Sequence, residues 1–443
     1  MKGLKTFNRG GVHPPGKKYL SENKPIKNAV ISDLSVIAMS QHLGSPSESI
    51  VNPGDTVREG MLIGKSTGFI SGNIHSPVPG TVKEISDIYL PNGMTSKAVV
   101  IEMEGEFDRL GKEVVETNWE HLSSKELIEI INSNGIVGLG GATFPANVKL
   151  TLPKGKKAEY LVINGVECEP YLTADHRLML EKADQIIDGI KIIASIIKPE
   201  KLVIGIEINK ENAIESIREA ASRAGLVLEV IALKVKYPQG DEKQLLKAVT
   251  GREVPSGALP IEIGCVVSNV GTVYSIYEAV VLGKPLIERV LTVSGGAVKN
   301  PQNLKVRIGT PIKSLIEECG GFTEEPVKVV VGGPMMGFTI YDLDTPVTKG
   351  TSGILALTAK EVNSAASTAC ISCGRCIAAC PMGLNPTTLF KYIDHSDYDS
   401  AENIGLMDCK ECGSCGYVCL ARIPLIQGMR LGKRMLRTKK VKA

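Results

Sequence analysis

Two short stretches near the end of the chain decide the fold of its last part: CISCGRCIAACP, residues 370–381, and CKECGSCGYVC, residues 409–419. Each has the spacing Cys-x2-Cys-x2-Cys-x3-Cys, and together they hold eight of the eleven cysteines. Three thiols at this spacing can hold three corners of an iron–sulfur cubane from one loop, so the fourth corner needs another cysteine. Structural zinc sites instead use C-x2-C pairs separated by longer loops. The doubled run therefore predicts two [4Fe–4S] clusters.

The fourth cysteine of each run is expected to serve the other cluster, as in two-cluster ferredoxins. The predicted ligand sets are Cys370, Cys373, Cys376 and Cys419 for one cluster, and Cys409, Cys412, Cys415 and Cys380 for the other. The segments 387–393 and 401–406 look helical, which favours a helical ferredoxin-like domain over residues 358–443. Outside the runs, the isolated cysteines are expected to be buried thiols.

The charge pattern is uneven only at the end of the chain. Between Arg430 and Lys442 there are seven Lys or Arg residues and no acid. This basic tail is either a solvated helix end or a contact for an acidic partner or anionic lipid headgroups. Overall, 51 basic and 48 acidic residues give a net charge of +3, which gives no sign of a nucleic-acid partner.

A chain of 443 residues is too long for one compact core and predicts several domains. An apolar content of 43% and a charged content of 22% are ordinary for a soluble globular protein. The first residues, MKGLKTFNRGGVHPPGKK, lack an apolar h-region, and no apolar run is long enough to span a bilayer. If the protein works at a membrane, we expect a partner to hold it there.

Residues 33–115, which follow an N-terminal extension (residues 1–32), look all-β, because short Val and Ile runs alternate with turns rich in Gly, Pro, Asn and Asp. The pattern resembles the barrel-sandwich fold of lipoyl and biotinyl domains. Those domains carry a modified lysine at a hairpin tip, whereas the tip here reads Gly68-Phe69 and the nearest lysine is Lys65. We expect an unmodified domain with a structural or docking role.

Residues 116–287 alternate strands and helices, which predicts an α/β layer with a mostly parallel sheet. The expected strands are 160–165, 202–208 and 227–233, and the expected helices are 178–197 and 211–224. Such sheets bind ligands in the loops that follow the strand C-termini. Residues 288–357 return to short strands with glycine-rich turns and predict a small α+β domain.

A glycine-rich stretch, GIVGLGGATFPANVK (residues 135–149), opens the α/β region. It has four glycines within seven residues, but not the G-x-G-x-x-G spacing of a dinucleotide fingerprint. Glycine lets backbone approach a flat or anionic ligand closely. Polar residues follow where later strands meet loops, at 164–170, 237–242 and 268–272. Their groups suit the hydroxyls, ring nitrogens or phosphate of a flavin nucleotide.

Residues 135–149 resemble the flavin loop of the NADH-oxidising subunit of respiratory complex I, and the polar segments follow in that family's order. The region around 293–299 resembles the same family's β-grasp domain. Gly10–Pro15, the barrel-sandwich region and the doubled cysteine run are foreign to that subunit. Together with the flavin region, they resemble the RnfC family, the C subunits of Rnf complexes, along essentially the whole chain.

This resemblance implies that the chain binds FMN without a covalent bond and uses NAD(H) as a substrate. The implied FMN contacts are Gly138, Gly140, Gly141, Lys149, Asn164, Gly240, Asp241, Asn269 and Thr272. The implied nicotinamide-nucleotide contacts are Phe144, Lys149, Glu169 and Glu242, and Glu167 belongs to the same cofactor-binding region. The complex I loop has arginines where Val137 and Leu139 stand, an acid at Val166 and an aromatic residue at Leu152.

A flavin site followed by two clusters converts a two-electron hydride donor into single electrons, and this chemistry requires no general base. The resemblance implies a peripheral subunit on the cytoplasmic face of the cell membrane. It would work in an ion-translocating ferredoxin:NAD oxidoreductase complex, with the other Rnf subunits and ferredoxin or a ferredoxin-like carrier as partners. Two alternatives stay open: a soluble flavin/Fe–S reductase, such as a microcompartment cobalamin reductase, or an electron-wire subunit without flavin.

Overall fold

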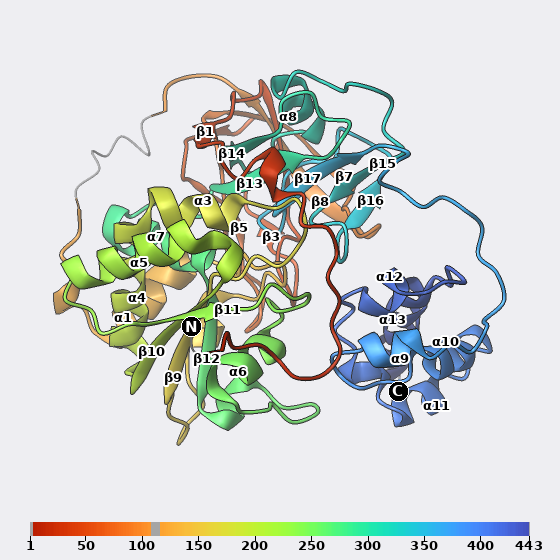
Figure 1. Ribbon diagram of the computed structural model, residues 1–443. Coiled ribbons are helices and arrows are strands. Elements are labelled where there is room, and N and C mark those ends of the chain that lie inside the picture. The colour runs from red at the N-terminus through yellow and green to blue at the C-terminus, as the bar shows by residue number, and fades with distance from the viewer. Residues whose placement is uncertain (1–2, 108–115, 443) are drawn as a thin grey trace.

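The computed structural model describes residues 3–107 and 116–442. An α/β part, a barrel-sandwich part and a β-grasp part pack against one another, and a helical fourth part lies to one side (Figure 1). Residues 108–115, at the end of the predicted barrel-sandwich range, lie outside the described residues. The architecture confirms the predicted fold class, a multidomain α/β protein.

The α/β part is built on a four-stranded sheet with the order β11-β10-β9-β12. Its strands are β9 (Tyr160–Asn164), β10 (Lys201–Glu207), β11 (Glu229–Leu233) and β12 (Cys265–Asn269). All neighbours run parallel, and Asn164 lies opposite Asn269 in the register. The ends of β9 and β12 therefore present amide side chains at the same edge of the sheet.

Helices cover both faces of this sheet (Figure 1). Leu161 and Ile163 of β9 face a core that includes α1 (Ser124–Ser133), α2 (Ala146–Leu150), α5 (Glu211–Arg223) and α7 (Val270–Leu282). The intervening Val162 faces α6 (Glu242–Thr250) on the other side, as the alternation of a strand requires.

The prediction of a single helix over 178–197 is wrong. The chain forms α3 (Ala174–Glu181) and α4 (Ala183–Ile197), which also belong to the first core. The break falls at Lys182, whose φ is −133°. Both helices contact α5 and α7, but α3 also contacts strands of the β-grasp part, whereas α4 also contacts α1.

Two sheets with a shared core form the barrel-sandwich part. One contains β2 (Leu34–Ala38), β8 (Thr95–Met103), β7 (Gly80–Tyr89) and β4 (Thr56–Val57). The other contains β3 (Glu48–Ser49), β5 (Leu62–Lys65) and β6 (Ile74–His75).

A mixed six-stranded sheet forms the β-grasp part together with α8 (Ile312–Glu318). Its order is β1 (Ile26–Asn28), β14 (Gln302–Arg307), β13 (Glu288–Ser294), β17 (Gly353–Leu357), β15 (Lys328–Val331) and β16 (Phe338–Ile340). Strand β1 comes from the predicted N-terminal extension and runs parallel to β14. The extension thus completes a sheet whose other strands come much later in the sequence.

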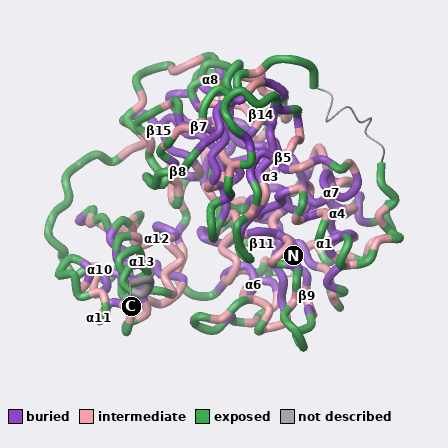
Figure 2. The backbone as a smooth tube through the Cα atoms, turned by 180° about the vertical axis from the view of Figure 1, so that it is seen from behind, coloured by how far each residue is buried: buried purple, intermediate pink, exposed green. Residues whose placement is uncertain are grey.

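The fourth part, the cluster domain, is helical and has a small core of its own. Its helices are α9 (Arg375–Ala379), α10 (Pro386–Asp394), α11 (Tyr398–Asn403), α12 (Ser414–Tyr417) and α13 (Leu425–Lys442). A linker leads to it from the β-grasp part, and residues 363–375 are all exposed, as the green arc in Figure 2 shows. Among the described residues, no helix combines the length and apolarity needed to cross a membrane.

Residues 5–21, here called the N-terminal strap, join these parts. Lys5 pairs with Leu233 at the end of β11, and Val12 pairs with Tyr237. In Figure 1 the dark-red trace runs from the sheet to the cluster domain and then rises towards the β-grasp sheet. The strap therefore crosses the sheet edge that carries the polar strand ends.

Candidate functional site

The glycine loop (residues 135–145) lies against the end of β12 and the start of α7. It is closed by a hydrogen bond from the Gly138 amide to the Phe144 carbonyl, 2.8 Å. The Leu139 amide donates to the Thr272 hydroxyl, 2.8 Å, and a Cβ at Gly140 would lie 3.3 Å from Asn269 Cβ. Gly141 has φ +107° and open space where a Cβ would lie. The tip of the loop is therefore exposed backbone, and its inner side is fixed by the contacts with Thr272 and Asn269.

The predicted asparagines support this edge. Asn269 caps α7 by accepting from the amides of Gly271 and Thr272, and its amide group donates to Asp175, 2.7 Å. Burial and the neighbouring Glu167 raise the pKa of Asp175 to about 7. Asn164 donates to the Gly240 carbonyl, 2.9 Å. This bond brings the loop after β11 to the end of β9.

Charged residues lie beside the loop. The Lys149 ammonium is 2.8 Å from the Glu242 carboxylate and donates to the Val267 carbonyl, 3.0 Å. Both charged side chains remain about one third exposed. Asp241 caps α6, and burial raises its pKa. Phe144 is half-buried.

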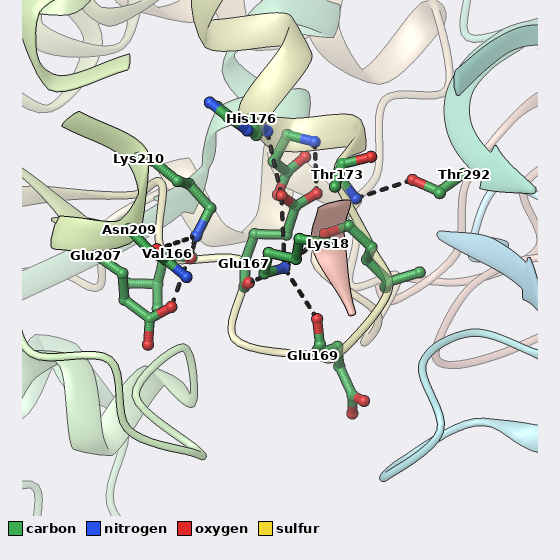
Figure 3. A network of polar contacts seen from close by, with 12 residues as sticks. Lys18, Val166, Glu167, Glu169, Thr173, His176, Glu207, Asn209, Lys210 and Thr292 are labelled. Carbon is green, nitrogen blue, oxygen red and sulfur yellow. Dashed lines mark hydrogen bonds and ion pairs between the residues drawn. The ribbon is translucent and has the colours of Figure 1, made fainter. Parts of the chain in front are cut away.

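Two buried lysines hold the backbone of the loop that follows β9 (Figure 3). Lys18, from the strap, donates to the carbonyls of Glu167, 2.9 Å, and Glu169, 3.0 Å. Lys210 donates to the Val166 carbonyl, 2.8 Å, and forms an ion pair with Glu207, 3.5 Å. Burial lowers the pKa of Lys18. Neither lysine was predicted, because isolated lysines 18 and 210 have no motif around them.

The two predicted glutamates of this loop both have protein partners. The Glu167 carboxylate accepts from the amides of Asp175 and His176 at the start of α3. The Glu169 carboxylate accepts from the amides of Met335 and Met336 in the β-grasp part and lies 3.2 Å from the Tyr237 hydroxyl. Burial raises the pKa of Glu169 to about 7. Glu169 therefore joins two domains, and a contact with nucleotide would compete with these bonds.

The edge as a whole fits FMN. The exposed glycine tip offers backbone to a flat ring, amide side chains flank it, and Lys149 offers a cation suited to phosphate. Bound there, FMN would supply hydride and single-electron chemistry.

Four cysteines gather in one apolar pocket, which we call the inner cluster site: Cys380, Cys409, Cys412 and Cys415. The last cysteine of the first run thus lies with the first three of the second. The Leu384 amide donates to Cys380 Sγ, 3.3 Å, and the Glu411 amide to Cys409 Sγ, 3.4 Å. Burial raises the pKa of Cys412 to about 11 and that of Cys415 to about 12, so cluster assembly must release protons.

We call the other four predicted ligands, Cys370, Cys373, Cys376 and Cys419, the outer cluster site. Cys370 and Cys373 are exposed. The Thr368 amide donates to the Ala421 carbonyl, 2.9 Å, which brings the chain before Cys370 alongside the chain after Cys419. Thiol donors with amide hydrogen bonds to sulfur suit iron–sulfur clusters at both sites.

Family models match four consecutive regions. They are the RnfC barrel sandwich hybrid domain (residues 5–106), the Nuo51 FMN-binding domain (131–278), the SLBB domain (290–339) and the 4Fe-4S dicluster domain (363–420). The FMN and dicluster matches confirm the predicted cofactors at the level of domains. The roles of single residues remain predictions.

Relatives match nearly the whole chain. The C subunit of the proton-translocating ferredoxin:NAD(+) oxidoreductase complex of Clostridium ljungdahlii is 49% identical over 96% of this chain and 93% of its own. The chain belongs to the RnfC family. The C subunit of the Na(+)-translocating complex of Acetobacterium woodii is 44% identical over 96% of both chains. The C subunit of the ion-translocating oxidoreductase complex of Rhodobacter capsulatus is 42% identical over 98% of this chain and 84% of its own.

The fold of this RnfC-family chain also has a likeness among solved structures. A chain of an NAD+-reducing [NiFe]-hydrogenase superposes with a TM-score of 0.53 at 16% identity, over 70% of this chain and 62% of its own. At this identity, the likeness shows shared architecture alone.

Proposed function

We propose that this chain exchanges hydride between NAD(H) and non-covalently bound FMN at the glycine loop, and passes single electrons through two [4Fe–4S] clusters. It would act as a peripheral subunit on the cytoplasmic face of the membrane, in an ion-translocating ferredoxin:NAD oxidoreductase complex. The names of its relatives support this assembly. The observation that carries the proposal is that the glycine loop, Asn164 and Asn269 share one sheet edge in a chain with two cysteine runs.

The residues have separate roles in this proposal. The backbone of Gly138, Gly140, Gly141 and Gly240 approaches FMN, while Asn164, Asp241, Asn269 and Thr272 fix the surrounding loops. Lys149 and Glu242, beside the glycine loop, orient the FMN phosphate and the nicotinamide nucleotide. Phe144 of the same loop lies beside them. Glu167 and Glu169 hold the loop after β9 in place.

The test is anaerobic purification followed by FMN, iron and sulfide analysis and an NADH-dependent viologen assay. Gly141→Val fills the open space at the loop tip and is expected to abolish flavin retention. Gly155→Val is the matched control, because Gly155 also has a positive φ, +81°, and open space, but lies outside the glycine loop. Flavin-loaded protein that NADH does not reduce would overturn the proposal.

A further inference from the structure

The inner cluster site faces the α/β part directly. The Tyr237 hydroxyl donates to the carbonyl of Cys412, 2.7 Å, and Gln244 at the start of α6 reaches Met382, 3.3 Å. Ser256 donates to Asp408, 2.6 Å, just before Cys409. Three separate contacts therefore hold the inner site against the α/β part.

Among the described residues, the outer cluster site forms no hydrogen bond of this kind to the α/β part, although Val418, beside Cys419, packs against Val12 and Tyr237. The hydrogen bonds of residues 366–377 stay within the cluster domain, to Ala421, Arg422 and Thr387. Two outer cysteines are exposed. The two sites thus differ in what they face.

One short loop joins the inner site to the candidate flavin edge. Gly240 accepts a hydrogen bond from Asn164 at this edge, and three residues earlier Tyr237 contacts Cys412. The oxygen of the buried Tyr237 hydroxyl also lies 3.2 Å from the Glu169 carboxylate. The connection from the flavin edge to an inner ligand is therefore four residues long.

The N-terminal strap fixes the same junction. Val12 and Tyr237 exchange two backbone hydrogen bonds, 2.8 and 2.9 Å, and the Gly11 amide donates to the Ala379 carbonyl, 2.9 Å. Gly10 has φ +60°, and a Cβ there would lie 2.5 Å from the carbonyl carbon of Cys380. The strap is thus packed between the loop after β11 and the inner site.

We propose that the cluster at Cys380, Cys409, Cys412 and Cys415 exchanges electrons with the flavin, and that the outer cluster exchanges them with an external carrier. Tyr237 acts as a positioning residue for the inner cluster. This order rests on the proposed function. In the NADH-oxidising direction, each NADH yields NAD+, one proton and two electrons, which pass singly through the inner and then the outer cluster to a carrier protein that is reduced.

The order is tested with two single-cluster variants. Cys373→Ser is designed to remove the outer cluster and Cys412→Ser the inner one, with iron and FMN content measured in both. EPR then follows electron exchange of the remaining cluster with NADH and with NAD+. The expected result is wild-type exchange in Cys373→Ser, and exchange slowed at least about tenfold in Cys412→Ser. The reverse pattern would overturn the order.

A second pair of variants, each of which removes only one hydroxyl, tests the order of the clusters if Cys412→Ser does not fold. Tyr237→Phe removes the hydroxyl beside Cys412, and Thr387→Val removes the hydroxyl 3.6 Å from Cys376 at the outer site. Tyr237→Phe is expected to slow exchange between flavin and clusters several-fold, whereas Thr387→Val leaves it unchanged. Slowing by Thr387→Val alone would contradict the order. If NADH fails to reduce the flavin in unaltered protein, the proposed function fails instead.

Discussion

The two cysteine runs have nearly the same local structure but different surroundings. Ser372 and Glu411 occupy the same place in their runs, both have positive φ, 56° and 53°, and both donate an amide to the first cysteine at 3.4 Å. Yet Cys370 and Cys373 are exposed, while Cys412 lies against Tyr237. Spacing alone thus forms the ligand loop, whereas tertiary contacts assign each loop its neighbour.

The largest expected effect tests whether each cysteine run holds one cluster by itself. Cys380→Ser should eliminate the inner cluster, although Cys380 belongs to the first run, because its side chain lies with Cys409, Cys412 and Cys415. Cys419→Ser should eliminate the outer cluster. Iron analysis with EPR checks both variants, and loss of the cluster in the same run would show that the pairing is wrong.

A second prediction separates docking of the inner site from cluster assembly. Gly10→Val places a side chain against the backbone of Cys380 and should slow flavin-to-cluster exchange by about tenfold, equivalent to about 1.4 kcal/mol in the barrier. Both clusters should still assemble. Gly16→Val is the control, because a Cβ at Gly16 meets nothing within 4 Å. Stopped-flow absorbance measures the rates, and equal rates in the two variants would argue against a role for the strap.

A third prediction concerns the carrier protein. Ile371 and Leu420, beside the outer cysteines, are 63% and 51% exposed, and the exposed Arg375 and Arg422 flank them. This face suits an acidic, ferredoxin-like carrier. Ile371→Glu should raise the KM for such a carrier by about tenfold, or about 1.4 kcal/mol, and leave NADH reduction of the flavin unchanged.

The matched control is Ile404→Glu, because Ile404 is also exposed, 40%, on the cluster domain but belongs to neither cysteine run. A KM that rises equally in both variants would remove this assignment of the outer face.

The smallest effect concerns the support of the glycine loop. Lys349 is buried and donates to the carbonyls of Asn73 and Gly135. Burial lowers its pKa from 10.5 to about 7. Because folding disfavours the charged form, the stability linked to Lys349 is full above pH 10.5 and is lost as the pH falls through about 7.

Melting temperatures should therefore rise between about pH 7 and 9 in the wild type, and rise less in Lys349→Met. This variant should also bind FMN a few-fold more weakly, because two carbonyls lose a donor at a cost of about 1–3 kcal/mol. Both clusters should remain. If the melting temperature of Lys349→Met depends on pH as it does in the wild type, Lys349 is not the source of this pH dependence.

Much of the flavin edge could be predicted from sequence, because its signals are local. Glycine spacing marks residues 135–141, and the polar ends of β9 and β12 follow buried runs. In a parallel sheet these ends must meet at one edge, and the structure brings Asn164 and Asn269 together there.

The connections between domains could not be predicted. The strap forms single bridges to residues more than 220 positions away, and β1 joins a sheet about 275 residues later. Such pairings leave no periodic pattern in a short segment. The same holds for Tyr237 and for the buried lysines 18, 210 and 349, whose partners are mostly backbone carbonyls from other parts of the chain.

The most direct test of the electron path is rapid-freeze-quench EPR of the intact anaerobic protein after mixing with NADH. The spectra of the two single-cluster variants provide reference signals for the inner and outer clusters. The path predicts that the inner signal changes first and that the outer signal follows. An outer signal that changes before the inner one would contradict it.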